Sequence, residues 1–514
     1  MATYNWSKPR QSQQDVLPLN EPGKLVSEEY AVKAMPSILG TLDMTAVYLI
    51  AIFFIVNAVT AASGGAAAFT YLLLGAGAFF IPCVIATAQL GTMFPHEGSL
   101  YNWTHRALGG YWSFFIGFCA WFPGVLVIVA GADIVVSYIQ GLNSNWLTQP
   151  WQQGLVLIFI IALSGFISVQ RLRTVQNVVN VVIGLIFVAV VLIGLAGIVW
   201  LLKGNPSATV FSNLSGWGIV WNGSSANINL FGLITLAYLG TEVPLNMGGE
   251  MLGSKNDREK SRQVVKGHLL WGTMLVLVGY FVATYSVLVV EGSAAGSAGG
   301  YALVTTVSTV FGNVLGIIVA VCIMSFFFLV PVVYNSAFAR LLLVGGIDRR
   351  LPVKVGRLNK NRVPANAIIL QTILAIIFTA LAFLVVPYIT TIGGKASDLA
   401  VEVYNVSQAA ATLVWAISTA FFFIDLAIFY FRDRITFNRQ RIFPMPLLWL
   451  CAFIGPIACL IAIIDTLFFS WIPLQIGNSN WWYIVGGITI ICIVVAAVGS
   501  MLASSEVAWQ ELSK

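Results

Sequence analysis

The chain alternates between long apolar blocks and short polar connections. Val178–Leu202 and Leu269–Val290 are typical blocks, and a bilayer-spanning helix needs roughly 20 mostly apolar residues. This pattern predicts an all-α integral membrane protein of about twelve transmembrane helices with no sizeable inserted soluble domain. The predicted spans cover approximately residues 40–63, 67–93, 111–140, 154–169, 178–202, 228–249, 269–290, 308–339, 366–387, 403–431, 446–470 and 482–503.

Composition and charge agree with this pattern. Hydrophobic residues make up 58% of the 514 positions and charged residues only 9%, whereas soluble domains carry about 25% charged residues. If the N-terminus is cytosolic, 24 of the 26 Lys and Arg residues fall on cytosolic segments, and only Lys203 and Lys395 do not. The positive-inside rule therefore accounts for the basic patches without a nucleic acid. We expect a multi-pass protein of the cell membrane with both termini in the cytoplasm.

Two predicted spans are interrupted by polar or helix-breaking residues. The first contains Asn57, followed by Ser63-Gly64-Gly65, and the sixth contains Gly240, Glu242 and Pro244 within five positions. Transporters built from inverted repeats place broken helices at corresponding positions of each half, with the substrate between them. The alternative is a simple kink whose freed backbone groups are satisfied by neighbouring helices.

Ionisable residues inside spans are costly and are candidates for function. Glu242 lies within the interruption of the sixth span, and Asp133 lies late in the third. We take both as candidates for coupling transport to a proton, although Glu242 could only brace the break and Asp133 could lie at the outer interface. Asp425 is expected to pair with Arg432 at the inner side.

Other chemistry is not indicated. The six cysteines lie in apolar blocks without a CxxC pair, and the three histidines lie in or beside polar connections, so neither a metal site nor a cofactor is expected. The sequence contains no phosphate-binding loop and no nucleophile–base set. We expect that the protein is not an enzyme.

Three segments resemble the amino acid–polyamine–organocation superfamily of permeases. They are Gln89–Trp103 (QLGTMFPHEGSLYNW), Ala237–Glu242 (AYLGTE) and Arg340–Pro364, which contains DRRLP and NKNRVP. The first span and the stretch Asn359–Pro364 are most similar to the glutamate/γ-aminobutyrate antiporter branch.

The resemblance implies a leucine-transporter-like fold of two inverted five-helix repeats plus two helices. The corresponding division is a cytosolic tail (1–38), a ten-helix transport core (39–435), two additional helices (436–503) and a second cytosolic tail (504–514). It also implies a substrate site, with Tyr238 as an aromatic gate. Its residues would be Ile55, Val56, Asn57, Ala58, Val59, Thr60, Tyr238, Leu239, Gly240, Thr241 and Glu242, with Trp121 and Ser325 as further candidates.

Two departures from the family pattern bear on mechanism. The first-span stretch reads Val56-Asn57-Ala58 in place of a Gly-x-Gly, and Val178–Leu202 contains no Lys where proton-coupled members often have one. The resemblance implies secondary transport of amino acids or related amines, with proton coupling and exchange for a counter-substrate both left open. The alternative is a non-transporting amino-acid sensor on the same fold.

Overall fold

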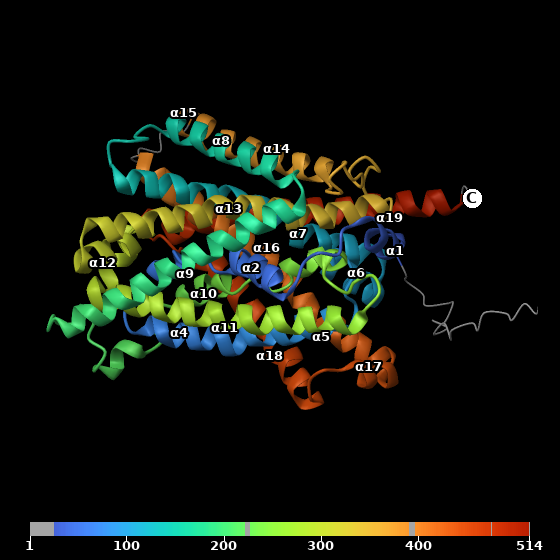
Figure 1. The fold of residues 1–514 in the computed structure, drawn as a ribbon, viewed down its shortest axis with the longest axis horizontal. Helices are drawn as coiled ribbons and strands as arrows, with labels where there is room; N and C mark the ends of the chain where they lie inside the picture. Colours follow the sequence, from blue (N-terminus) through green and yellow to red (C-terminus); the bar gives the residue numbers. More distant parts are fainter. Residues whose placement is uncertain (1–24, 222–226, 390–395, 474, 513–514) are drawn as a thin grey trace, which may run out of the picture.

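The computed structural model is an elongated helical bundle (Figure 1). It describes residues 25–221, 227–389, 396–473 and 475–512, so the first 24 residues of the predicted tail and Lys395 lie outside the described part. Its helices are α1 (Val26–Ala34), α2 (Thr41–Ile52), α3 (Asn57–Ala62), α4 (Ala67–Gly75), η1 (Ala76–Phe80), α5 (Ile81–Met93), α6 (Ser99–Leu108), α7 (Gly110–Leu142), α8 (Pro150–Ser168), α9 (Leu172–Leu202), η2 (Leu214–Trp217), α10 (Leu230–Ala237), η3 (Val243–Glu250), α11 (Arg258–Val290), η4 (Gly292–Ala298), α12 (Ala302–Phe311), α13 (Asn313–Ile347), α14 (Ala365–Ala380), η5 (Leu381–Val385), α15 (Val386–Ile389), α16 (Ala396–Arg432), α17 (Arg434–Gln440), α18 (Met445–Phe468) and α19 (Asn478–Leu512).

Ten continuous helical segments within the described residues are long and apolar enough to cross a membrane. The two other predicted spans, 40–63 and 228–249, are each split into a pair of short helices, α2 with α3 and α10 with η3. The predicted helical membrane fold is thereby confirmed. One boundary differs, because Gly312 with φ +90° separates α12 from α13, so residues 302–311 form a helix of their own.

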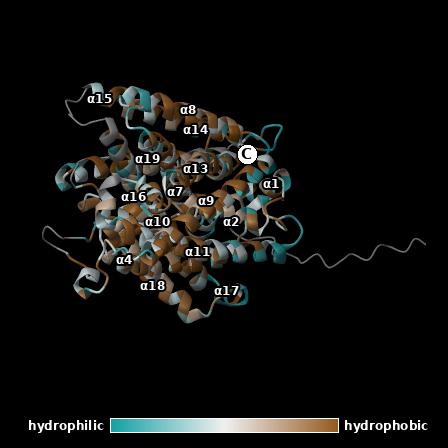
Figure 2. Ribbon diagram, turned by 60° about the vertical axis from the view of Figure 1, so that its left-hand side comes forward, coloured by the Kyte–Doolittle hydropathy of each residue, from teal (hydrophilic) through white to brown (hydrophobic). Residues whose placement is uncertain are grey.

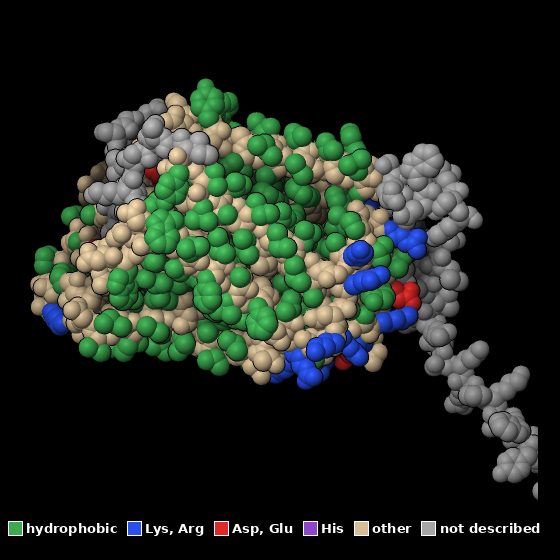
Figure 3. All heavy atoms as spheres, turned by 90° about the horizontal axis from the view of Figure 1, so that it is seen from above, with side chains coloured by type: hydrophobic (Ala, Val, Ile, Leu, Met, Phe, Trp, Pro, Cys, Tyr) green, Lys and Arg blue, Asp and Glu red, His purple; other side chains and the backbone are tan. Residues whose placement is uncertain are grey.

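The outer faces of the bundle are apolar, and its ends are polar (Figures 2 and 3). Phe159, Phe453 and Ile491 each expose about two thirds of their surface, as expected for side chains that face lipid rather than water. Basic side chains gather at one end (Figure 3). We call this the basic end; it carries α1, α6, α17 and the connections that follow α5, η3, α13 and α16.

Helix α1 lies across the basic end and is bonded to the core. Ser27 donates two hydrogen bonds of 2.9 Å to the carboxylate of Asp348, and Glu28 pairs with Arg106 at 2.6 Å. Burial raises the pKa of Asp348 to about 6, against the opposing effect of the Ser27 hydrogen bonds. The predicted N-terminal tail therefore includes a segment, residues 25–38, that packs against the bundle. At the other terminus, α19 continues through most of residues 504–514, of which 513–514 lie outside the described part.

A buried ion cluster joins α13, the end of η3 and the connection between α5 and α6. Arg340 of α13 reaches both carboxylate oxygens of Glu250 at the end of η3, at 2.9 and 3.2 Å, and lies 3.7 Å from Glu97. All three side chains are fully buried. Burial and the neighbouring Glu250 raise the pKa of Glu97, whose other oxygen accepts the amide of Gly249 at 2.8 Å. This cluster fixes η3 to the long helix α13.

Candidate functional site

The first helix break lies at residues 53–56. Helix α2 ends at Ile52; the next residue, Phe53, has φ and ψ of −82° and 69°, and the amides of Phe54 and Ile55 bond only two residues back. Asn57, Ala58 and Val59 then bond three residues back. The break therefore exists, but it begins about one helical turn before Asn57, the residue at which the sequence indicated an interruption. The residues at the break are bulky and partly β-branched rather than glycine, which explains why the sequence signal is weak.

Two tyrosine hydroxyls bond carbonyls at this break; that of Ala51 has no described backbone donor, while those of Ile52 and Phe54 also accept backbone amides. Tyr334 of α13 donates to the carbonyl of Ala51 at 2.7 Å, and Tyr280 of α11 donates to the carbonyls of Ile52 and Phe54 at 3.0 and 3.3 Å. Buried carbonyls without partners would destabilise an interrupted helix in the membrane. Tyr334 thus supplies the donor that the Ala51 carbonyl lost, whereas the Val56 amide has no described partner.

The second break lies at residues 238–242 and includes Gly240 and Glu242, two of the residues that interrupt the sixth predicted span. Gly240 has φ +103°, and a Cβ there would lie 3.3 Å from the ring of Trp415. The left-handed conformation and the close ring both favour glycine at this position. The amides of Gly240 and Thr241 donate to no partner within the described chain, so this break presents unused donors.

Glu242 is buried beside these amides. Its Oε1 accepts a 2.6 Å hydrogen bond from the Trp415 indole, while its Oε2 has no described partner. The neighbouring Thr241 hydroxyl is bonded to that of Thr87 at 2.8 Å. The carboxylate is therefore held in place by one oxygen and leaves the other available.

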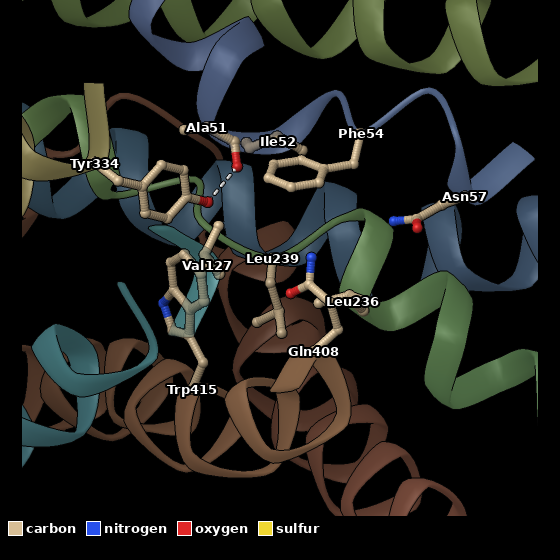
Figure 4. Close-up of a pocket in the computed structure, with 10 residues that line it drawn as sticks. All are labelled: Ala51, Ile52, Phe54, Asn57, Val127, Leu236, Leu239, Tyr334, Gln408 and Trp415. Atoms are coloured by element: carbon tan, nitrogen blue, oxygen red, sulfur yellow. Dashed lines mark hydrogen bonds between the residues drawn. The ribbon is translucent and has the colours of Figure 1, made fainter. Parts of the chain in front are cut away.

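The two breaks meet at a small buried cavity (Figure 4). The space open to the centre of a water-sized sphere is about 10 Å³, which is room for about one water molecule. Its lining comes from both broken helices and from α7, α13 and α16. The lining residues are Ala51, Ile52, Phe54, Asn57, Val127, Leu236, Leu239, Tyr334, Gln408 and Trp415.

The structure brings only some of the predicted site residues to this cavity. Asn57 and Leu239 line it. Glu242 does not, but it is hydrogen-bonded to the lining residue Trp415. Tyr238 does not line it: its ring stacks on Phe80 with centroids 4.6 Å apart, and its hydroxyl donates to the carbonyl of Leu72. The other predicted residues of the two breaks are absent from the lining: Ile55, Val56, Ala58, Val59, Thr60, Gly240 and Thr241.

The two weaker candidates are also bonded elsewhere. Trp121 donates to the side chain of Gln371 at 3.1 Å, and Ser325 donates to the carbonyl of Val321 on its own helix. Neither lines the cavity.

Two buried carboxylates lie in other parts of the bundle. Asp133 of α7 is fully buried, and neither of its oxygens has a described partner; it interacts electrostatically with Tyr404, which donates to Asn57 at 3.1 Å. The predicted pairing of Asp425 with Arg432 is wrong. Asp425 accepts from Thr104 at 2.7 Å, whereas Arg432 donates to the backbone carbonyls of Arg106 and Ala107.

Sequence reasoning missed the contribution of α16. Gln408 and Trp415 both line the cavity, and the Oε1 of Gln408 has no described partner. They are seven residues apart, which places them on one face of a helix. A polar residue and a tryptophan at this spacing inside an apolar span could have indicated that this face of α16 lines the site.

A membrane-embedded helical bundle with two interrupted helices around a shared cavity has the architecture of a secondary transporter. The amino acid permease family model matches residues 39–505. The chain therefore belongs to the amino acid permease family, within the superfamily that the motifs indicated. This is a family of transporters rather than enzymes, in agreement with the sequence-based expectation.

Similarity to individual known proteins is distant. The chain is 23% identical over 227 residues to an uncharacterized transporter of Legionella pneumophila, covering 43% of this chain and 46% of that protein. It is 25% identical over 232 residues to the gamma-aminobutyric acid permease of Bacillus subtilis, covering 44% and 46%. It is 24% identical over 336 residues to the branched-chain amino acid permease BcaP of Lactococcus lactis, covering 62% and 69%. The matches thus span less than half the length of the first two relatives.

Proposed function

We propose that the protein is a secondary transporter that moves amino acids or related amines across the cell membrane by alternating access. The observation that carries this proposal is the meeting of two helix breaks at one buried cavity, beside unused hydrogen-bonding groups. Because the cavity has room for about one water molecule, a substrate can enter only when the half-helices move apart. Such movement is the basis of alternating access.

The unused groups match the two ends of an amino acid. The free amides of Gly240 and Thr241 are suited to a substrate carboxylate. The free oxygens of Glu242 and Gln408 are suited to an ammonium group. The gamma-aminobutyric acid and branched-chain permeases among the relatives favour amino-acid substrates.

Counterflow in proteoliposomes tests this function. Vesicles are loaded with one member of a panel of amino acids and amines, and uptake of the same labelled compound is measured with and without a pH gradient. We expect accelerated uptake for at least one member. Specific binding without any counterflow by the folded protein would instead favour the alternative, a non-transporting sensor.

Glu242 and Asp133 are the proposed coupling residues if a proton accompanies the substrate. Glu242→Gln removes the titratable group but keeps an acceptor for Trp415. We predict that uptake by this variant no longer varies with pH, while exchange of substrate for substrate continues with a weaker apparent affinity, because a ligand of the substrate ammonium has lost its charge. The matched variant Asp133→Asn is measured in the same way. The coupling residue is the one whose substitution removes the pH dependence of uptake. Full activity of Glu242→Gln with an unchanged pH profile would exclude Glu242 from this role.

We further propose that the basic end faces the cytosol, because most Lys and Arg residues lie there. In a variant without the six native cysteines, a new cysteine is placed at Lys255 on the basic end or at Leu214 in η2, both exposed positions. A membrane-impermeant thiol reagent added to intact cells should label only the second position. Labelling at Lys255 would reverse the proposed orientation.

A further inference from the structure

A second buried carboxylate site lies outside the cavity, where α10 contacts α18. Asp465 of α18 exposes only 3% of its surface. Its Oδ2 accepts the Gly232 amide at 2.6 Å, and its Oδ1 has no described partner. Gly232 belongs to the first turn of α10, where helix amides lack partners within the helix. Asp465 therefore holds the half-helix that leads into the second break.

Two hydroxyls with no described partner belong to the same contact. The hydroxyls of Thr235 on α10 and Thr466 on α18 are both fully buried. A Cβ on Gly232 would lie 2.3 Å from the Thr466 hydroxyl and 2.9 Å from Asp465 Oδ2, so both groups converge on this glycine. Thr235 lies three residues further along, on the same face of α10. Asp465 Oδ1 and the Thr466 hydroxyl are thus unsatisfied oxygens at one helix contact, and the unsatisfied Thr235 hydroxyl lies one turn further along the same face of α10.

Nothing described beside Asp465 carries a positive charge. The ion pairs of the described residues use Lys33, Arg106, Arg173 and Arg340, all with other acids.

The groups that face Asp465 are neutral. Tyr71 of α4 interacts electrostatically with Asp465, and its hydroxyl donates to Asn227 at 2.9 Å. On α19, the Trp481 indole donates to the backbone carbonyl of Thr466. An ionised carboxylate in such surroundings is strongly disfavoured, so the site requires a positive charge from outside the chain.

We propose that Asp465, Thr235 and Thr466 form a binding site for one monovalent cation, a proton or a sodium ion. Carboxylate and hydroxyl oxygens are hard ligands that suit either cation. Occupancy neutralises Asp465 and so stabilises the contact between α10 and α18. The next residue after Thr235, Leu236, lines the cavity (Figure 4). The site is therefore placed to link cation binding to the position of the helix that leads into the second break.

Thermal unfolding of the purified full-length protein tests binding without requiring transport. The unfolding midpoint is measured against sodium chloride at constant pH, with choline chloride as the ionic-strength control, and against pH in choline chloride. A ligand that binds only the folded state raises the midpoint with its concentration. We expect Asp465→Asn to abolish the dependence on one of these cations. The matched variant Asp425→Asn also replaces a buried carboxylate with one bonded oxygen and one oxygen without a described partner, but it lies away from this contact, beside Thr104, and should keep the dependence.

The two arms identify the cation. Sodium-dependent stabilisation that Asp465→Asn removes identifies sodium, and a pH dependence that the variant removes in choline identifies a proton. Wild-type dependence on both cations retained in Asp465→Asn would overturn the proposal, as would a wild-type midpoint independent of both. If Asp465→Asn does not fold, Thr235→Val and Thr466→Val serve instead. Each should weaken the apparent cation affinity roughly tenfold or more by removing a ligand to a charged group, and unchanged affinity in both would overturn the proposal.

The consequence for transport rests on the proposed function and is measured separately. In proteoliposomes, Asp465→Asn should lose uptake driven by the gradient of the identified cation while retaining counterflow. Absence of counterflow in the wild-type protein would contradict the proposed function but would leave the thermal binding result intact. Retained gradient-driven uptake in the variant would contradict the coupling role of this site.

Discussion

At the first helix break, the Tyr334 hydroxyl replaces the lost amide donor of the Ala51 carbonyl and the Val56 amide has no described partner, whereas at the second break two amides and a buried carboxylate oxygen have none. Both breaks interrupt a membrane helix, so both free backbone groups that lipid cannot satisfy. The difference indicates that the first break is braced by its neighbours. The second keeps its hydrogen-bonding capacity for a ligand, and only there does a buried acid stand beside the open backbone.

The largest expected effect concerns the anchor of the second broken helix. Arg340→Met leaves Glu250 and Glu97 buried without their cation. Removing one partner of a buried ion pair costs about 3–5 kcal/mol, so we expect a large fall in the thermal unfolding midpoint. The exposed Arg357→Met is the control. A fall no larger than that of the control would show that this anchor contributes little.

The next effect tests how the carboxylate at the second break is held. Trp415→Phe removes the only described side-chain donor to Glu242 while keeping an aromatic ring beside Gly240. The loss of a hydrogen bond to a charged group costs about 1.5–3 kcal/mol. We expect a lower unfolding midpoint and weaker substrate binding in counterflow. If Glu242→Gln in combination with Trp415→Phe restores stability, the carboxylate charge is the cause; an equal loss in the double variant would contradict this reason.

A smaller effect is expected at the first break. Tyr334→Phe removes the donor to the carbonyl of Ala51, which is a neutral acceptor, so the cost should be about 1 kcal/mol. Stability should fall slightly, and the pH profile of uptake should keep its shape because no titrating group at the breaks has changed. The companion variant Tyr280→Phe should behave alike, since it also bonds neutral carbonyls. A changed pH profile in either variant would end the distinction between a braced break and a ligand-binding one.

The smallest effect is expected at Ser325, which contacts neither break. Its hydroxyl donates to the carbonyl of Val321 within its own helix. Ser325→Ala should therefore change stability by no more than about 0.5 kcal/mol and should leave counterflow unchanged. A marked loss of counterflow would show that the cavity extends to this residue during transport.

Much of the fold follows from the sequence because the bilayer restricts the possible structures. The backbone N–H and C=O groups of a membrane span must be hydrogen-bonded within the span itself, so a long apolar block such as Val178–Leu202 forms a helix. The break at Gly240 was equally predictable, since glycine, an acid and proline together oppose a continuous membrane helix. The motifs of Gln89–Trp103 and Ala237–Glu242 indicated the superfamily that the family match confirms.

The tertiary structure decided which side chains meet. Tyr238 is adjacent to the second break in sequence, but it packs against Phe80, away from the cavity. Trp415 is 173 residues from Glu242 in sequence and yet donates to its carboxylate. The same holds for Asp465 and Gly232, which belong to different helices. Apolar periodicity states that a helix forms and which face is buried, but the rotation and contact of one helix against another depend on side-chain packing between distant segments, which no local pattern encodes.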